Sequence, residues 1–307
     1  MLDQVDKYLA LQPGEVFCDC TLGGAGHSVF LGRRLGSDGL LIGIDRDEEA
    51  IRASRPRLQE SLPELEAKTI HGNFADLDDL LLDLLIPGVD AFLFDLGTSS
   101  HQLDTPIRGF SYSQDAPLDM RMDPGNQTLT AAEVINTIDE ADLARIIYSY
   151  SEERWSRRIA RAVVAQRAIK PFKTTSELVQ VIRQAVPAAT RRSGGNPAKR
   201  TFQALRIHLN SELAAIEKAL EAALRWLNPG GRMVVLSYHS LEDRIVKHRF
   251  AEATQGCVCP PEATICVCGR QSVFESLTRK PETPELGELQ ANPRSSSARL
   301  RAVVRRV

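Results

Sequence analysis

The 307-residue sequence has no long apolar run and no apolar block at its start. No stretch approaches the roughly 18 consecutive apolar residues that a membrane-spanning helix needs. The first ten residues carry Asp3, Asp6 and Lys7, where a signal peptide would be apolar. With 43% apolar and 25% charged residues, the composition is that of an ordinary soluble globular protein. We therefore expect a cytoplasmic protein without a membrane partner, and its oligomeric state stays open.

A strong net charge is also absent, because 38 basic side chains face 40 acidic ones and leave a net charge of −2. This balance does not exclude a nucleic-acid partner, since the distribution of charge decides. Acidic residues gather in segment 76–90, and basic ones in segments 154–173 and 294–306. The first basic segment fits a phosphate-binding surface, but by itself it is more typical of a solvated helix face with Glu152 and Glu153 as partners.

Short apolar runs alternate with helical segments in the first hundred residues, and we expect buried strands at 16–20, 40–44, 68–71 and 91–94. This alternation is typical of parallel βαβ units and predicts a doubly wound α/β sheet. From 103 to 200 only helices are indicated, and capping boxes begin two of them at Thr130 and Thr174. The pattern then predicts one long helix over 202–227, a strand over 232–238 and, within 298–307, a strand-like segment at 300–304.

A glycine-rich turn, Gly23-Gly24-Ala25-Gly26, follows the first expected strand, and Asp45 ends the next one. Glycines let the backbone approach a ligand, and an acidic side chain at that place can accept hydrogen bonds from ribose hydroxyls. A dinucleotide and S-adenosylmethionine both fit, and a plain turn is the alternative. Val29 stands where the dinucleotide fingerprint needs a third glycine. Together with the late turn at 229–231, this favours the methyl donor over an oxidoreductase cofactor.

From Asp95 to Asp104, the segment DLGTSSHQLD resembles the 16S ribosomal RNA (cytosine-N4) methyltransferases, the family of ribosomal RNA small subunit methyltransferase H. Matching segments run along the whole chain, at 20–28, 108–111, 117–124, 152–155, 200–206, 237–244 and 292–295. The resemblance implies an α/β class I methyltransferase (Rossmann-like) sheet formed by residues 1–102 and 201–307. It places an inserted all-helical substrate domain at 103–200, in agreement with the pattern of the chain.

The same resemblance implies N4-methylation of the cytidine at position 1402 of 16S rRNA in the small ribosomal subunit, with S-adenosyl-L-methionine as the cofactor. It assigns seven residues to cofactor binding, namely Ala25, Gly26, His27, Asp45, Phe74, Asp95 and Gln102. For Phe74, residue type alone favours an ordinary core aromatic. A protein that keeps the fold and binds RNA without catalysis is the alternative from another class, and the intact Asp45, Asp95 and glycine turn argue against it.

Catalysis is expected to involve Asp95 and His239. The exocyclic amine of cytosine is a poor nucleophile, so methyl transfer to it needs accurate placement and an acceptor for the amine protons. Asp95 ends a strand, where such acceptors lie in open α/β sheets. A structural role for His239 is equally compatible with the sequence. The family usually carries Phe just before this histidine, whereas this chain has Tyr238.

The six cysteines include two Cys-Val-Cys pairs, at 257–259 and 266–268. Four thiolates in one short segment can hold zinc, although zinc sites usually have at least two residues between paired cysteines. Because methyl transfer does not need this loop, we assign no metal to the active site. Cys18 and Cys20 alternate on an expected strand, which predicts two core residues.

Overall fold

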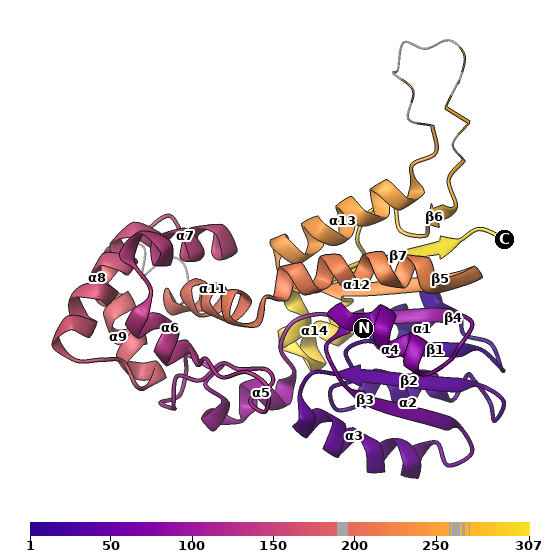
Figure 1. The fold of residues 1–307 in the computed structure, drawn as a ribbon, viewed down its shortest axis with the longest axis horizontal. Helices are drawn as coiled ribbons and strands as arrows, with labels where there is room; N and C mark the ends of the chain where they lie inside the picture. The colour runs from indigo at the N-terminus through magenta and orange to yellow at the C-terminus, as the bar shows by residue number, and fades with distance from the viewer. Residues whose placement is uncertain (189–195, 258, 260–264, 266–267, 270) are drawn as a thin grey trace. The chain divides into compact units, whose positions relative to one another are not determined.

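The computed structural model describes residues 1–188, 196–257, 259, 265, 268–269 and 271–307, and the chain forms two units (Figure 1). The first contains Met1–Gly97 and Leu213–Val307, and the second contains Thr98–Glu212. The sequence placed these boundaries at 102/103 and 200/201. The second boundary falls later because helix α11 (Ala198–Asn210) buries Phe202 and Leu205 in the core of the helical unit.

A seven-stranded sheet forms the centre of the first unit, in the order β3-β2-β1-β4-β5-β7-β6. Its strands are β1 (Val16–Asp19), β2 (Leu40–Asp45), β3 (Glu66–His71), β4 (Val89–Asp95), β5 (Leu227–Ser237), β6 (Phe274–Ser276) and β7 (Arg299–Arg305). The first five strands pair in parallel, and β7 runs antiparallel to β5 and β6. The predicted α/β fold class is confirmed, and each of the six expected strands is present, although β5 begins at Leu227 and includes the segment 229–231 that was expected as a turn.

Both faces of the sheet are covered, as a doubly wound sheet requires. On β4, Phe92 and Phe94 belong to one apolar cluster, whereas Ala91 and Leu93 belong to another. Successive strand residues point to opposite faces, so the two clusters mark the two sides of the sheet. One side packs on α4 (Leu77–Asp83), α12 (Glu212–Trp226) and α13 (Ser240–Thr254), and the other on α1 (Leu2–Leu9), α2 (Gly26–Gly32) and α3 (Glu48–Ser61).

The second unit is helical, and no strand is present among its described residues. Its α-helices are α5 (Ser100–Asp104), α6 (Ala131–Thr137), α7 (Glu140–Ser151), α8 (Ser156–Ile169), α9 (Thr175–Ala185) and α11. Both predicted capping boxes are confirmed. Glu133 Oε2 accepts from Thr130 N at 2.7 Å, and Glu177 Oε2 accepts from Thr174 N at 3.2 Å. Within the described ranges, no helix has the length and apolar character needed to cross a membrane.

The single helix expected over 202–227 is wrong, because the chain forms α11 and α12 instead. Ser211 lies between them in the left-handed region, at φ 50°, and ends α11. The buried Asn210 side chain fixes this end, since its Nδ2 donates to Met120 O and its Oδ1 accepts from Met122 N, both at 2.9 Å. Helical periodicity continues through such a break, so the pattern alone did not reveal it.

Candidate active site at the carboxyl edge of the sheet

Parallel strands end together at one edge of the first unit, and three of them end in aspartate. Asp19 ends β1, Asp45 ends β2 and Asp95 ends β4, while Tyr238 follows β5. The strand order reverses at β1, which lies between β2 and β4. In open α/β sheets the ligand crevice lies at this switch point, outside the carboxyl ends of the strands.

The glycine turn leaves room for a ligand beside it. Gly23 has φ +49°, and Ala25, the residue before α2, has φ +58°. A Cβ built on Gly26 would meet nothing within 4 Å. Asp19 stabilises both ends of the turn, because its Oδ2 accepts from Ser28 Oγ at 2.6 Å and its Oδ1 accepts from Thr21 N at 3.1 Å. Burial of the Asp19 carboxyl raises its pKa.

The Asp45 carboxylate is held by backbone donors on both oxygens. Its Oδ2 accepts from Gly23 N at 2.7 Å and its Oδ1 accepts from Asp47 N at 2.8 Å. Withdrawal from water raises the pKa of Asp45 to about 6, although both backbone hydrogen bonds oppose this shift. Each carboxylate oxygen accepts more than one hydrogen bond, so further acceptor capacity remains for a ligand with hydroxyl groups.

Asp95 is the centre of a small hydrogen-bond network. Its backbone N–H donates to Thr21 Oγ1 at 2.6 Å, and its Oδ1 accepts from the Tyr238 hydroxyl at 2.7 Å. His27 Nδ1 lies 3.5 Å from Asp95 Oδ2. Burial and the neighbouring Asp95 charge raise the pKa of Tyr238 far above its usual value, so the phenol stays protonated and donates at every physiological pH.

His27 also offers a polar atom for a bound molecule. Its Nε2 is buried and has no hydrogen-bond partner within the described part of the chain. An unsatisfied buried ring nitrogen costs stability unless a ligand or water completes it. The open space at Gly26, the acceptor capacity of Asp45 and this orphaned nitrogen therefore fit a ligand that carries hydroxyl groups and a carboxylate, as S-adenosylmethionine does.

The other predicted site residues have clear structural partners. His239 is the N-cap of α13, where its Nδ1 accepts from Glu242 N at 3.4 Å; its buried Nε2 lies 3.1 Å from Glu242 Oε1 without the geometry of a hydrogen bond. The Phe74 ring packs edge-on against Phe94 with 6.0 Å between centroids. Gln102 lies in the second unit, in a capping box with Ser99. Their functional roles stay predictions.

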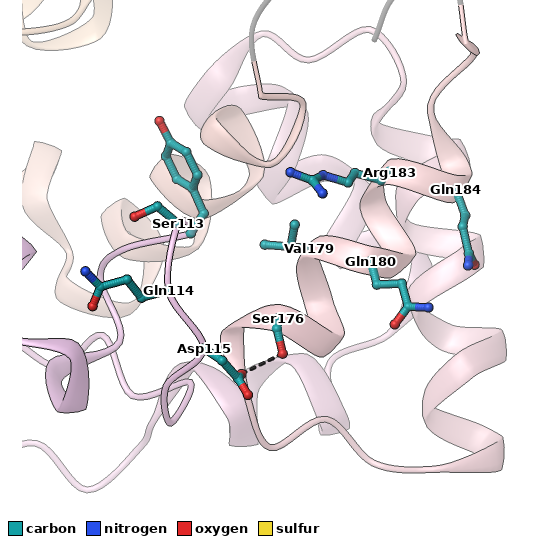
Figure 2. Close-up of a pocket in the computed structure, with 9 residues that line it drawn as sticks. Ser113, Gln114, Asp115, Ser176, Val179, Gln180, Arg183 and Gln184 are labelled. Carbon is teal, nitrogen blue, oxygen red and sulfur yellow. Dashed lines mark hydrogen bonds between the residues drawn. The ribbon is translucent and has the colours of Figure 1, made fainter.

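The helical unit has a separate cavity of about 320 Å³, drawn in Figure 2. It lies between the segment 112–115 and α9, and Asp115 accepts from the Ser176 hydroxyl at its rim (2.5 Å). Arg183 supplies a cationic group to the lining. None of the residues that the sequence assigned to the site lines this cavity, so it is distinct from the crevice at the sheet edge.

Sequence reasoning missed Asp19 and Tyr238 as site residues. A signal for Asp19 was present, since it is an acidic residue at the end of a strand immediately before the glycine turn. For Tyr238 the signal was its departure from the Phe that the family usually carries. Its importance depends on the pairing of Asp95 with Leu236 in neighbouring strands, which brings the two side chains together.

A doubly wound sheet with strand order 3-2-1-4-5-7-6, an antiparallel seventh strand and a glycine turn at the switch point defines a class I S-adenosylmethionine-dependent methyltransferase. A model of the MraW methylase family matches residues 1–306. The chain therefore belongs to the MraW methylase family and is a methyltransferase.

Relatives named ribosomal RNA small subunit methyltransferase H match nearly the whole chain. The protein of Symbiobacterium thermophilum is 48% identical over 305 residues, covering 99% of this chain and 95% of that protein. The protein of Geobacter sp. strain M21 is 50% identical over 301 residues, covering 98% and 96%. Among solved structures, an rRNA methylase from Streptococcus thermophilus aligns with a TM-score of 0.42 and 12% identity, covering 100% of this chain and 94% of that chain.

Proposed function

We propose that this protein methylates the exocyclic N4 amine of the cytidine at position 1402 of 16S rRNA, in the small ribosomal subunit and in the cytoplasm. The observation that carries the proposal is the 48% identity over 305 residues with a ribosomal RNA small subunit methyltransferase H. The match covers 99% of this chain, and the assignment of the target base rests on the segment 95–104 within it.

The cofactor would be held by residues of the first unit. Asp45 would accept hydrogen bonds from the ribose hydroxyls, and His27 Nε2 would donate to the amino-acid carboxylate beside Ala25 and Gly26. Phe74 would contact the adenine. When bound, S-adenosylmethionine supplies a methyl group made electrophilic by its sulfonium. On the basis of the family resemblance, we also propose Gln102 as a cofactor contact.

Asp95 would accept a hydrogen bond from the target amine. The lone pair of this amine is delocalised into the ring. The amine reacts faster when a carboxylate accepts a hydrogen bond from its N–H and orients it toward the methyl group. Tyr238 donates to Oδ1 and His27 Nδ1 lies 3.5 Å from Oδ2, and each oxygen keeps acceptor capacity for the amine. We assign a second catalytic role to His239, which follows β5 and lies next to Tyr238 in the chain.

RNA binding would use the exposed face of α8 in the helical unit. Arg157 and Arg158 are exposed and make no ion pair with any residue that the structure describes. Glu153, one expected partner of this basic segment, instead lies 3.5 Å from Arg200. Exposed arginines without an ion pair suit phosphate contacts, which position RNA without reading its sequence. A base inside a helix must be single-stranded or flipped out to reach a site of this kind.

The test is methylation of small ribosomal subunits that lack the modification. Purified protein and labelled S-adenosylmethionine are incubated with subunits and, separately, with naked 16S rRNA, and the modified nucleotide is mapped by mass spectrometry. We expect N4-methylcytidine at position 1402 in at least one substrate. Asp95→Asn should abolish the label, whereas Asp38→Asn, an exposed aspartate in a surface turn, should retain it. Label at another nucleotide, or full activity of Asp95→Asn, would contradict the proposal.

A further inference from the structure

The segment between α13 and β6 contains cysteines that lie close together and that belong to none of the strand ends described above. Of its two Cys-Val-Cys pairs, Cys257, Cys259 and Cys268 are described, and Cys266 lies outside the described residues. The Sγ atoms of the three described cysteines all lie within 4.8 Å of one another. Cys257 Sγ and Cys268 Sγ, which come from different pairs, are 3.7 Å apart.

These distances match a shared metal ion better than a disulfide. Zn–S bonds of about 2.3 Å at tetrahedral angles place two sulfur ligands about 3.8 Å apart. A disulfide would need about 2.05 Å between them. The Cys259 backbone N–H also donates to Cys257 Sγ at 3.4 Å, a contact that stabilises a thiolate. The one-residue spacing between Cys257 and Cys259 does not keep their Sγ atoms apart, because all three sulfur atoms lie within 4.8 Å of one another.

The buried cysteines provide an internal contrast. Cys18 and Cys20 have Sγ atoms 3.8 Å apart, but they lie in the apolar core and no third ligand joins them among the described residues. Burial raises the pKa of the Cys20 thiol, so it resists the deprotonation that metal binding requires. The loop cysteines are solvent-accessible, and ions and released protons can reach and leave them.

We propose that Cys257, Cys259 and Cys268 bind one zinc ion, which closes the loop between α13 and β6. Three thiols lose their protons as three Zn–S bonds form, so one Zn²⁺ is taken up and three protons are released to solvent. A soft divalent ion is the class that three thiolates select. The site is independent of methyl transfer and would link Cys257, just after α13, to Cys268, just before β6.

The test uses the full-length chain, purified in reducing buffer without chelators. Zinc is measured by plasma mass spectrometry, and it is released with a mercurial in the presence of a chromogenic chelator. We expect about one zinc per chain in the wild type and background zinc in Cys257→Ser and Cys268→Ser. Gln271→Ser, an exposed residue of the same loop, should retain the ion. Unchanged circular dichroism and S-adenosylmethionine binding in the serine variants exclude unfolding as the cause.

Cobalt substitution of the wild-type chain gives a second measurement that needs no variant. Co²⁺ bound by thiolates should produce a sulfur-to-metal charge-transfer band in the near ultraviolet and intense visible bands of a tetrahedral ion, and excess Zn²⁺ should remove both. Wild-type protein without zinc or cobalt bands would overturn the proposal. So would zinc retained by the Cys257→Ser/Cys268→Ser double variant, or a Cys257–Cys268 disulfide found by mass spectrometry in metal-free protein.

Discussion

Lowering the pH should weaken cofactor binding through Asp45, and the structure sets the size of the effect. The pKa of this carboxyl is raised from 3.8 to about 6, mainly by burial, with further raising by the charges of Asp47 and Asp19. Only the ionised form offers acceptors on both oxygens to ribose hydroxyls. At pH 5 about one molecule in eleven is ionised if the pKa is about 6, so the Kd for S-adenosylmethionine should be about tenfold higher at pH 5 than at pH 7.

Isothermal titration calorimetry between pH 5 and pH 7 measures this dependence. The α-amino group of the cofactor titrates near 8, and its carboxyl well below 5, so both keep their charges in this window. Asp45→Asn removes the titrating group but keeps one acceptor oxygen, and it should bind weakly with a flat pH profile. A wild-type Kd that changes less than twofold from pH 7 to pH 5 would refute the assignment of Asp45 to the ribose.

The same carboxyl should affect the stability of the cofactor-free protein in the opposite direction. Its folded-state pKa lies above the unfolded value, so its contribution to the free energy of unfolding is complete below pH 3.8 and is lost as pH rises through about 6. The shift amounts to roughly 3 kcal/mol at most, at 1.36 kcal/mol per unit. Urea unfolding of wild type and Asp45→Asn at pH 4 and pH 7 should show this difference in pH dependence.

Three further predictions concern the remaining proposed residues. Tyr238→Phe removes the hydroxyl that orients the catalytic carboxylate, and kcat should fall about tenfold with KM for the cofactor unchanged; a kcat within twofold of wild type refutes that role. His239→Asn keeps a side chain that can cap α13 but has no imidazole, so its free energy of unfolding should stay close to that of the wild type. His239→Ala should lose about 1 kcal/mol with the cap, and both variants should lose activity. An active His239→Asn protein with an unchanged pH–rate profile removes the histidine from the chemistry. Replacing Arg157 and Arg158 by Ala should lower the slope of log Kd for RNA against log salt by roughly 0.7 per lost phosphate contact, whereas Arg52→Ala, on a helix of the sheet unit, should leave the slope unchanged.

Local pattern predicted most secondary-structure elements but not the breaks in them. The strands around Phe92 and Val235 are short apolar runs whose length alone indicates burial on both faces. β6 has three residues, too few for any periodicity. The break at Ser211 depends on the hydrogen bonds of Asn210 to the loop at Met120, and these contacts join residues about 90 positions apart.

Fold class, cofactor type and family were predictable from the sequence alone, because glycine turns, strand-ending aspartates and long family segments are local features of the chain. Which of these residues come into contact depends on the tertiary structure. Parallel pairing of β1, β4 and β5 brings Asp95 against Tyr238 and close to His27, so that the tyrosine hydroxyl, which Phe lacks, donates to Asp95. The tertiary structure likewise brings Cys257 near Cys268, because the approach of side chains distant in sequence depends on the path of the folded chain.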